Sequence, residues 1–183
     1  GAAPVHDSVY RNVYERQFLA MSSLDYSARR EAWLSEANIC LHAFVTRFVT
    51  FSASEKRRTE LYLDPASTWP RLERILAIHF FSAAKNDIEK LFNLGGKGST
   101  VMDMLVGFRY AELKDVFSTF LKVQKILNPK WISTACRTTN VKSKGFVAVT
   151  FEDGKGDLVQ AFLLEFQVSE RHFQLYNPVP QLL

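Results

Sequence analysis

The hydrophobic pattern of the sequence changes its period at Pro129, and this change constrains the fold more than any other feature of the chain. Before Pro129, apolar residues recur every three or four positions, as they do along one face of an α-helix. After Pro129, segments rich in β-branched and aromatic residues are separated by the turn-forming stretches "KSKG", "GKGD" and "SER". The sequence therefore predicts a helical part that is followed by an antiparallel sheet.

Four helices are predicted before Pro129. Their apolar positions and capping residues place them over residues 8–22, 27–51, 67–92 and 100–127. The polar stretch "SASEKRR" at 52–58 interrupts the second apolar pattern and predicts a loop. Residues 59–65 are expected to form a short extended piece that ends at Pro65.

Four strands are predicted after Pro129, over residues 131–141, 146–153, 158–168 and 172–177. Neither set of alternating side chains in 146–151 is strongly polar, so we expect a sheet that is covered on both faces or curved around a helix. The predicted class is α+β, with about four helices followed by a four-stranded, antiparallel, curved meander sheet. A winged-helix-like arrangement is the alternative, since it also places helices before a hairpin.

The 183 residues suit one domain with a single core. We expect a mainly helical part over 1–129, the sheet over 130–177, and a tail over 178–183 whose two prolines cannot continue a central ladder. Over residues 30–177 the order of elements resembles the cone of nuclear-transport-factor-2-like domains. The resemblance lies in element order alone, without a shared motif, and implies helices packed on one face of a curved sheet.

The composition excludes several classes of protein. Hydrophobic residues make up 47% of the chain and aromatic residues 13%, with 15 Phe, so the chain is neither disordered nor of low complexity. No apolar run approaches the roughly 18–20 residues that a bilayer span needs. The two cysteines, Cys40 and Cys136, are expected to be reduced thiols of an intracellular protein, cytoplasmic or nuclear. The start "GAAPVHDS" lacks an initiating Met and predicts a piece of a longer protein.

The glycine-rich stretch "FNLGGKGSTVMD" at 92–103 looks at first like a phosphate-binding loop. A Walker loop needs Gly-Lys followed by Ser or Thr, whereas Lys97 precedes Gly98, and a helix rather than a strand is predicted before it. The stretch is better explained as a helix junction, in which a glycine ends one helix and Thr100 caps the next with Asp103. Gly107 is a position at which the fourth helix can bend or divide.

No motif for catalysis or for metal binding occurs in the sequence. The four histidines, at 6, 42, 79 and 172, are scattered, and neither His nor Cys residues recur at metal-ligand spacing. No nucleophile elbow or cysteine-protease context is present. We therefore expect no metal and no cofactor, and we favour a non-catalytic protein.

Positive charge is concentrated in residues 112–144, which hold seven basic and two acidic side chains. On a helix, Lys114, Lys122 and Lys125 share one face. The candidate anion or nucleic-acid contacts are these three together with Lys130, Arg137, Lys142 and Lys144. Such a patch suits nucleic-acid phosphates, an anionic membrane surface or an acidic protein. A solvated lysine face that keeps the domain soluble is the simpler interpretation.

Three functions are compatible with the sequence. The favoured one is a non-catalytic protein–protein interaction or assembly domain of a larger intracellular protein or complex. Its candidate protein contacts are Trp69, Trp131, Phe173 and Tyr176. The alternative is a nucleic-acid-binding domain that uses the basic segment 114–144. The second alternative is an enzyme of unknown chemistry, or a small-ligand pocket.

Overall fold

The computed structural model describes residues 9–37, 39–81, 91–94 and 100–129, together with Val159 and Phe162. A π-helix, η1 (Tyr10–Glu15), runs directly into α2 (Arg16–Leu34). The helices that follow are α3 (Leu41–Tyr62), α4 (Pro65–Phe80), α6 (Val101–Val106) and α7 (Tyr110–Leu127). No strand occurs among the residues that the structure describes.

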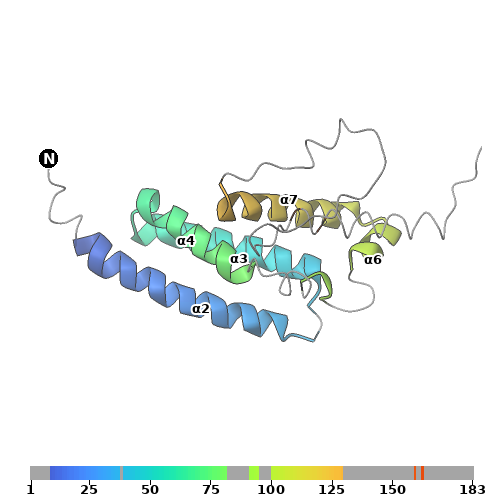
Figure 1. The fold of residues 1–183 in the computed structure, drawn as a ribbon, viewed down its shortest axis with the longest axis horizontal. Coiled ribbons are helices and arrows are strands. Elements are labelled where there is room, and N and C mark those ends of the chain that lie inside the picture. The colour runs from blue at the N-terminus through green and yellow to red at the C-terminus, as the bar shows by residue number, and fades with distance from the viewer. Residues whose placement is uncertain are drawn as a thin grey trace, which may run out of the picture.

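The helices form three layers (Figure 1). The middle layer consists of α3 and α4, which a two-residue turn joins into an antiparallel hairpin. On one side of this hairpin lies α2, which runs in the same direction as α4. On the other side lies α7, which contacts both α3 and α4, and short α6 lies beside the start of α7. Each side of the α3–α4 hairpin is therefore covered by one long helix.

The predicted α+β class is wrong for the part of the chain that the structure describes. Val159 and Phe162 belong to the third predicted strand, yet both are helical and buried in the core. Residues three apart lie on one face of a helix, and "LVQAFLLEF" fits that period as well as it fits a strand. The rest of 130–177 lies outside the described residues. We retain neither the meander sheet, nor the winged-helix-like alternative, nor the likeness to the nuclear-transport-factor-2-like cone.

The first helix boundary was also predicted wrongly. No break occurs at Ser22, because the helix continues to Leu34 and then breaks before Leu41, inside the helix predicted over 27–51. The polar stretch after Ser22 stays helical because Tyr26 is buried there with a hydrogen-bond partner on α3. Helix α3 begins at an unusual cap. The Cys40 Sγ accepts a hydrogen bond from the Ala43 backbone N–H at 3.4 Å.

The predicted loop at 52–58 and the extended piece at 59–65 are instead the second half of α3 and the start of α4. Ser52, Glu55 and Thr59 lie on the buried face of α3, so polar residues occupy positions where a packed helix usually carries apolar side chains. Helix α4 starts at Pro65, slightly before the predicted 67–68. Asp64 caps it by accepting a hydrogen bond from the Ala66 N–H at 3.1 Å.

The predicted start of the helix after the glycine-rich stretch is confirmed, whereas the glycines predicted to end the preceding helix lie outside the described residues. Thr100 Oγ1 accepts from the Asp103 N–H at 3.2 Å, and Asp103 Oδ2 accepts from the Thr100 N–H at 3.0 Å, which is a capping box. The division at Gly107 is confirmed as well, since this residue ends α6. Phe108 has a φ of 54°, the left-handed conformation that lets the chain turn into α7. Helix α7 ends before Pro129, as predicted.

Aromatic rings fill the core between the layers. Phe80, the last residue of α4, lies against rings of α2 and α3: Tyr26, Trp33, Phe44, Phe48 and Phe51. Its neighbour Phe81 contacts Phe44 and Phe48 of α3 and also Phe120 of α7. Phe120 in turn contacts Phe92 and Phe162. Two adjacent phenylalanines thus join both sides of the α3–α4 hairpin.

Two buried carboxylates fix α2 against the hairpin. The Tyr26 hydroxyl donates to Glu55 Oε2, and Arg58 Nη2 donates to the same oxygen at 2.6 Å. Burial, together with the Glu55 hydrogen bond, raises the pKa of Tyr26, so its hydroxyl stays protonated and acts as a donor.

The second buried carboxylate, Glu15, lies at the end of η1. It accepts hydrogen bonds from Thr68 Oγ1 and from Arg71 Nη1, each at 3.0 Å. Tyr10 extends this network, because its hydroxyl lies 3.0 Å from Thr68 Oγ1 and accepts from the Asp64 N–H. Every partner of Glu15 therefore lies on α4, which sets the position of η1 along the hairpin.

Candidate functional site

The structure describes four of the eleven residues predicted to make contacts. Lys114, Lys122 and Lys125 are exposed on α7, as the helical pattern predicted, and Trp69 is half-buried on α4. The seven others lie outside the described residues: Lys130, Trp131, Arg137, Lys142, Lys144, Phe173 and Tyr176. Whether the basic patch continues beyond α7 therefore stays a prediction.

Two of these predicted residues, Trp69 and Lys122, meet at a cavity between α3, α4 and α7. Its volume is about 370 Å³, which is within the range of small-ligand sites. Each helix contributes residues that lie one turn apart on one face: Phe48, Val49, Ser52, Ala53 and Lys56 from α3, Trp69 and Glu73 from α4, and Ser118, Thr119 and Lys122 from α7. The cavity combines an apolar base with polar groups around it.

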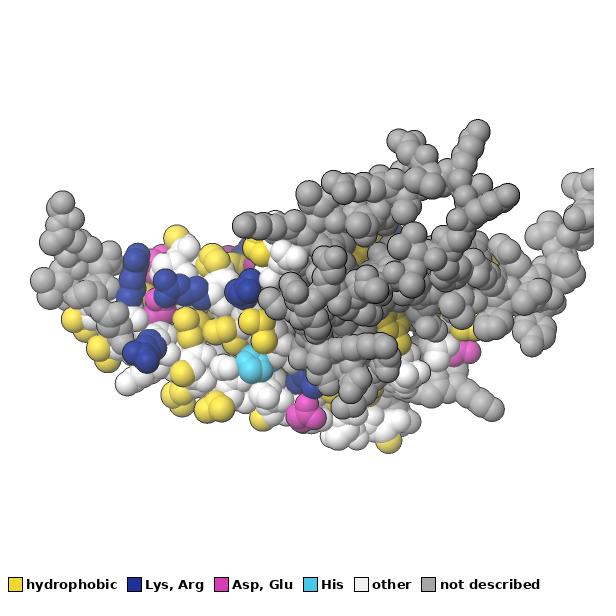
Figure 2. All heavy atoms as spheres, viewed as in Figure 1, with side chains coloured by type: hydrophobic (Ala, Val, Ile, Leu, Met, Phe, Trp, Pro, Cys, Tyr) yellow, Lys and Arg dark blue, Asp and Glu magenta, His cyan; other side chains and the backbone are white. Residues whose placement is uncertain are grey.

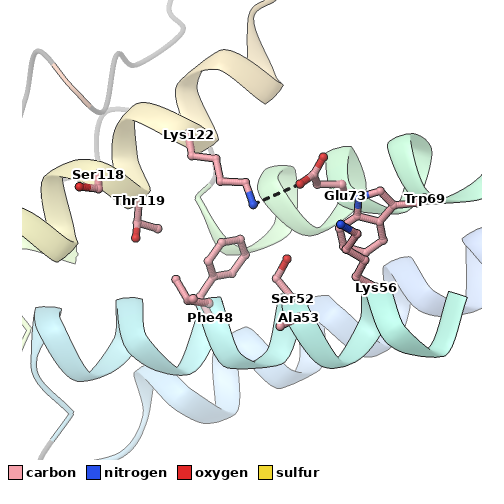
Figure 3. Close-up of a pocket in the computed structure, with 10 residues that line it drawn as sticks. Phe48, Ser52, Ala53, Lys56, Trp69, Glu73, Ser118, Thr119 and Lys122 are labelled. Atoms are coloured by element: carbon pink, nitrogen blue, oxygen red, sulfur yellow. Dashed lines mark ion pairs between the residues drawn. The ribbon is translucent and has the colours of Figure 1, made fainter. Parts of the chain in front are cut away.

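Charged side chains flank the mouth of the cavity. Lys122 Nζ lies 3.5 Å from Glu73 Oε1, so an ion pair joins α7 to α4 across the opening (Figure 3). Lys56 lines the cavity from α3, and its Nζ lies 4.0 Å from Glu60 Oε1, a weak and exposed pair. Two ammonium groups and one carboxylate thus line the cavity.

Two hydroxyl groups inside the cavity have no hydrogen-bond partner among the described residues. Ser52 and Thr119 are each 8% exposed. In Figure 3 the Ser52 hydroxyl points from α3 into the space between the helices, and the Thr119 side chain points toward α3 from the opposite wall. These hydroxyls add neutral donor and acceptor groups to opposite walls of the cavity.

The sequence predictions missed Ser52, Lys56, Glu73 and Thr119. Ser52 and Lys56 were assigned to a loop. Such residues can be recognised by their position on a helix. They are polar, whereas their neighbours three and four residues away are apolar and buried.

A second surface of interest is the outer face of η1 and α2. We call it the outer stripe, and it consists of Val9, Val13, Ala20, Met21, Leu24 and Ala28, all exposed. Leu24 is 75% exposed and Met21 is 72% exposed. Leu24 is two residues from the buried Tyr26, about 200° around the helix, so the outer stripe lies opposite the face that packs on the hairpin. Helix α2 is therefore apolar on two opposite faces.

Figure 2 shows this arrangement from one side. Hydrophobic side chains lie in separate groups along the edge of the molecule that η1 and α2 form. Lys and Arg side chains lie beside them on the same face. The outer stripe is thus an apolar surface with charged margins.

The described histidines do not form a metal site. His42 lies between Glu112 and Asp115 of α7. Its Nδ1 lies 3.3 Å from Glu112 Oε2, and its Nε2 lies 3.6 Å from Asp115 Oδ2. Arg109 also binds Glu112, and this hydrogen bond lowers the pKa of the Glu112 carboxyl. These contacts fasten the start of α3 to α7. Among the described residues no three His, Cys, Asp or Glu side chains are grouped as metal ligands are.

Within the part of the chain that the structure describes, Ser23 and His79 form a contact that resembles part of a catalytic constellation, with 2.6 Å between Ser23 Oγ and His79 Nε2. In a catalytic triad a carboxylate stabilises the protonated imidazole. Here burial, with the nearby Arg30 guanidinium, lowers the pKa of His79 and disfavours protonation. The contact therefore suits a structural link between α2 and α4 better than a general base.

This environment makes the stability of the protein depend on pH. The folded state holds the pKa of His79 below the ordinary value of about 6.5, so the unfolded state binds the proton more readily. Stability contributed by neutral His79 is present above about pH 6.5 and is lost as the pH falls through the window below it. We expect His79→Gln to lose less stability than the wild type between pH 7.5 and 5.5, measured by urea unfolding. An equal loss in both proteins would contradict this assignment.

No protein-family model, curated protein or solved structure matches the chain. The geometry of the described residues is therefore the basis for inferring function. Among those residues, no helix combines the length and apolar character needed to cross a bilayer.

Proposed function

We propose that this chain is a non-catalytic protein–protein interaction domain that binds a helix of a partner protein along the outer stripe. The observation that carries the proposal is the double-sided apolar character of α2. A helix that covers a core on one side normally presents charged and polar residues on the other. Contiguous exposed apolar side chains instead mark an interaction surface.

The shape of the outer stripe suits a helix. Val13 and Leu24 are eleven residues apart, about three turns, so they lie along one line of the surface. Ala20 and Ala28 alternate with the larger Leu24 at intervals of four residues. Such rows of small and large side chains form the grooves and ridges in which a second helix packs. The partner segment is therefore an amphipathic helix with apolar residues three and four positions apart.

The charges beside the outer stripe favour a protein partner over an anionic membrane. Arg11 and Arg16 are exposed at its amino-terminal half. At its carboxyl-terminal half Asp25 pairs with the exposed Arg29 at 3.3 Å, and Glu31 pairs with Arg30 at 2.7 Å. The charges of the carboxyl-terminal half therefore balance and give no net attraction to anionic headgroups, whereas a partner helix can place a complementary charge against each side chain. The proposed setting is a larger intracellular assembly.

Photo-crosslinking in cells that express the full chain tests this proposal. We expect a photoreactive amino acid at Leu24 to form covalent adducts with a defined protein, while the same amino acid at Ser54, exposed on α3, does not. Adding Val13→Glu should abolish the Leu24 adduct, because it places a charge on the outer stripe without touching the core. Leu61→Glu, a matched change at an exposed apolar residue of α3, should leave the adduct intact.

Several outcomes would reject the proposal. Adducts of equal yield from Leu24 and Ser54, or adducts unaffected by Val13→Glu, would show that the outer stripe is not a specific contact. Adducts to lipid would favour a membrane surface. Association that nuclease removes, and that Lys122→Glu/Lys125→Glu abolishes, would favour the nucleic-acid alternative.

A further inference from the structure

The side chains of the outer stripe are spaced symmetrically about its midpoint, which lies between positions 18 and 19. Val13 and Leu24 are equally far from this midpoint along the chain, and both are exposed. The same holds for Val9 and Ala28 at the two ends of the stripe. In a two-fold symmetric pair of antiparallel helices, residues equally far from the midpoint face one another. Two copies of the outer stripe can therefore place Val13 of each copy against Leu24 of the other.

The middle of the outer stripe is matched in the same way. Gln17 corresponds to Ala20, and Arg16 corresponds to Met21; all four are exposed. The small Ala20 leaves room for the longer Gln17 of a second copy. The hydrocarbon stem of Arg16 can lie on Met21 while its guanidinium group stays in water. Each large side chain in the middle of the pair therefore meets a small or a flexible one.

The charges along η1 and α2 favour the antiparallel direction. Arg11 and Arg16 make the amino-terminal half positive, because Glu15, which lies between them, is buried and paired with Arg71 of α4. The acidic and basic side chains of the carboxyl-terminal half pair with each other and balance. A parallel pair would bring two positive halves together, whereas an antiparallel pair sets each positive half against a balanced one.

The outer stripe is accessible along its length. Helix α2 forms an outer layer of the described helices, and the α3–α4 hairpin lies on its other side (Figure 1). From Val9 to Ala28 the stripe is about 28 Å long at 1.5 Å per residue. Its first part lies in η1, and π-helical turns are rare and frequently found at functional sites. A second copy can thus reach the stripe without displacing another described helix.

We propose that the helix bound by the outer stripe is α2 of a second copy of this chain, in an antiparallel dimer with two-fold symmetry. This inference rests on the proposed function, because it names the partner of the same surface. The symmetric spacing of the stripe is the observation that carries it, since a surface that binds its own copy must be self-complementary. Pairing would bury Met21 and Leu24, which are 72% and 75% exposed in the single chain.

Sedimentation equilibrium of the purified full chain measures this pairing. We expect a dimer whose Kd rises at least about tenfold with Val13→Glu or with Leu24→Lys, because each puts a charge into an apolar contact. Leu61→Glu, at an exposed apolar residue of α3, should leave the Kd unchanged. Far-ultraviolet circular dichroism should show unchanged helix content in every variant, since all three residues are exposed.

Mixing the two weakened variants tests the antiparallel register. When a Val13→Glu chain pairs with a Leu24→Lys chain, the new carboxylate meets the new ammonium group at one end of the pair. The native contact between Val13 and Leu24 is kept at the other end. We therefore expect the mixture to form dimers at a concentration at which neither variant does so alone. In a parallel pair each position would face its own counterpart, and mixing would restore nothing.

Each failure has a distinct meaning. A wild-type chain that stays monomeric, or a dimer that Val13→Glu does not weaken, would overturn the second-copy inference. Variants that fail to restore dimers on mixing would overturn the antiparallel arrangement. If the chain is monomeric but Leu24 crosslinks to a different protein in cells, this inference fails and the proposed function stands. If the chain is monomeric and Leu24 forms no specific adduct in cells, both fail.

Discussion

Replacing Phe80 with alanine should lower the free energy of unfolding by about 3–5 kcal/mol, the usual loss for a fully buried phenylalanine. Phe80 is completely buried at the end of α4 and lies against five rings from α2 and α3. Removing its ring leaves a cavity between the five surrounding rings. These rings can fill the cavity only if α2 or α3 moves as a whole. The variant should also lose much of its near-ultraviolet circular dichroism.

Urea unfolding at neutral pH measures this effect. Tyr62→Ala is the matched control, because Tyr62 is an aromatic residue of α3 that is 77% exposed. Its substitution should change the unfolding free energy by no more than about 0.5 kcal/mol. A loss below about 1.5 kcal/mol for Phe80→Ala would show that the aromatic cluster is not the centre of the core.

The second large effect is expected for Glu55→Ala, at about 2–4 kcal/mol. The substitution leaves the buried Tyr26 hydroxyl without its acceptor and removes a hydrogen bond between α2 and the middle of α3. Arg58 limits the loss, because its side chain is half exposed and can return to water when its partner is removed. Most of the effect therefore comes from the tyrosine.

A double-mutant cycle separates the contribution of the Tyr26–Glu55 hydrogen bond to stability from the other contributions of Glu55. Glu55→Ala should cost much less in a Tyr26→Phe background, since the stranded hydroxyl is then absent. Glu60→Ala provides the control, because Glu60 is exposed on the same helix and pairs only weakly with Lys56. Additive losses in the cycle would show that the Tyr26–Glu55 hydrogen bond contributes nothing of its own.

The sequence predicts those parts of the fold that depend on local chemistry. The junction at Thr100 and Asp103, the division at Gly107 and the end of α7 before Pro129 all follow from capping, glycine and proline rules, and all are confirmed. The helix over 52–62 was missed for a physical reason. Its inward side chains are polar, and the buried Glu55 accepts a hydrogen bond from Tyr26, which lies 29 positions away and is not revealed by any local pattern.

The strand assignment near Val159 and Phe162 failed for a related reason. Short segments that are apolar at most positions satisfy the period of a strand and that of a helix equally well. Both residues are helical and buried in the structure, and the Phe162 ring contacts Phe117 and Phe120. At these two positions burial in the core outweighs the β-propensity of the side chains.

The residues of the candidate cavity also come together through packing between distant segments, which the local sequence pattern does not reveal. Trp69 and Lys122 were each predicted as contact residues, but for different partners and without any link between them. They meet because α4 and α7 both pack on α3, an arrangement that depends on the core as a whole. Ser52 and Lys56 were not predicted to line a cavity, because their segment was assigned to a loop, whereas it is part of α3.

The continuous line of rings from Trp33 through Phe80 and Phe81 to Phe120 has a consequence for cooperativity. Phe80 and Phe81 are adjacent on the chain, yet one packs toward α2 and the other toward α7. If α2 detaches, Phe80 loses its ring contact with Trp33. If α7 detaches, Phe81, the next residue on the chain, loses its ring contact with Phe120. The three layers are therefore coupled into a single melting unit, in which stabilisation on the α7 side is also felt by α2.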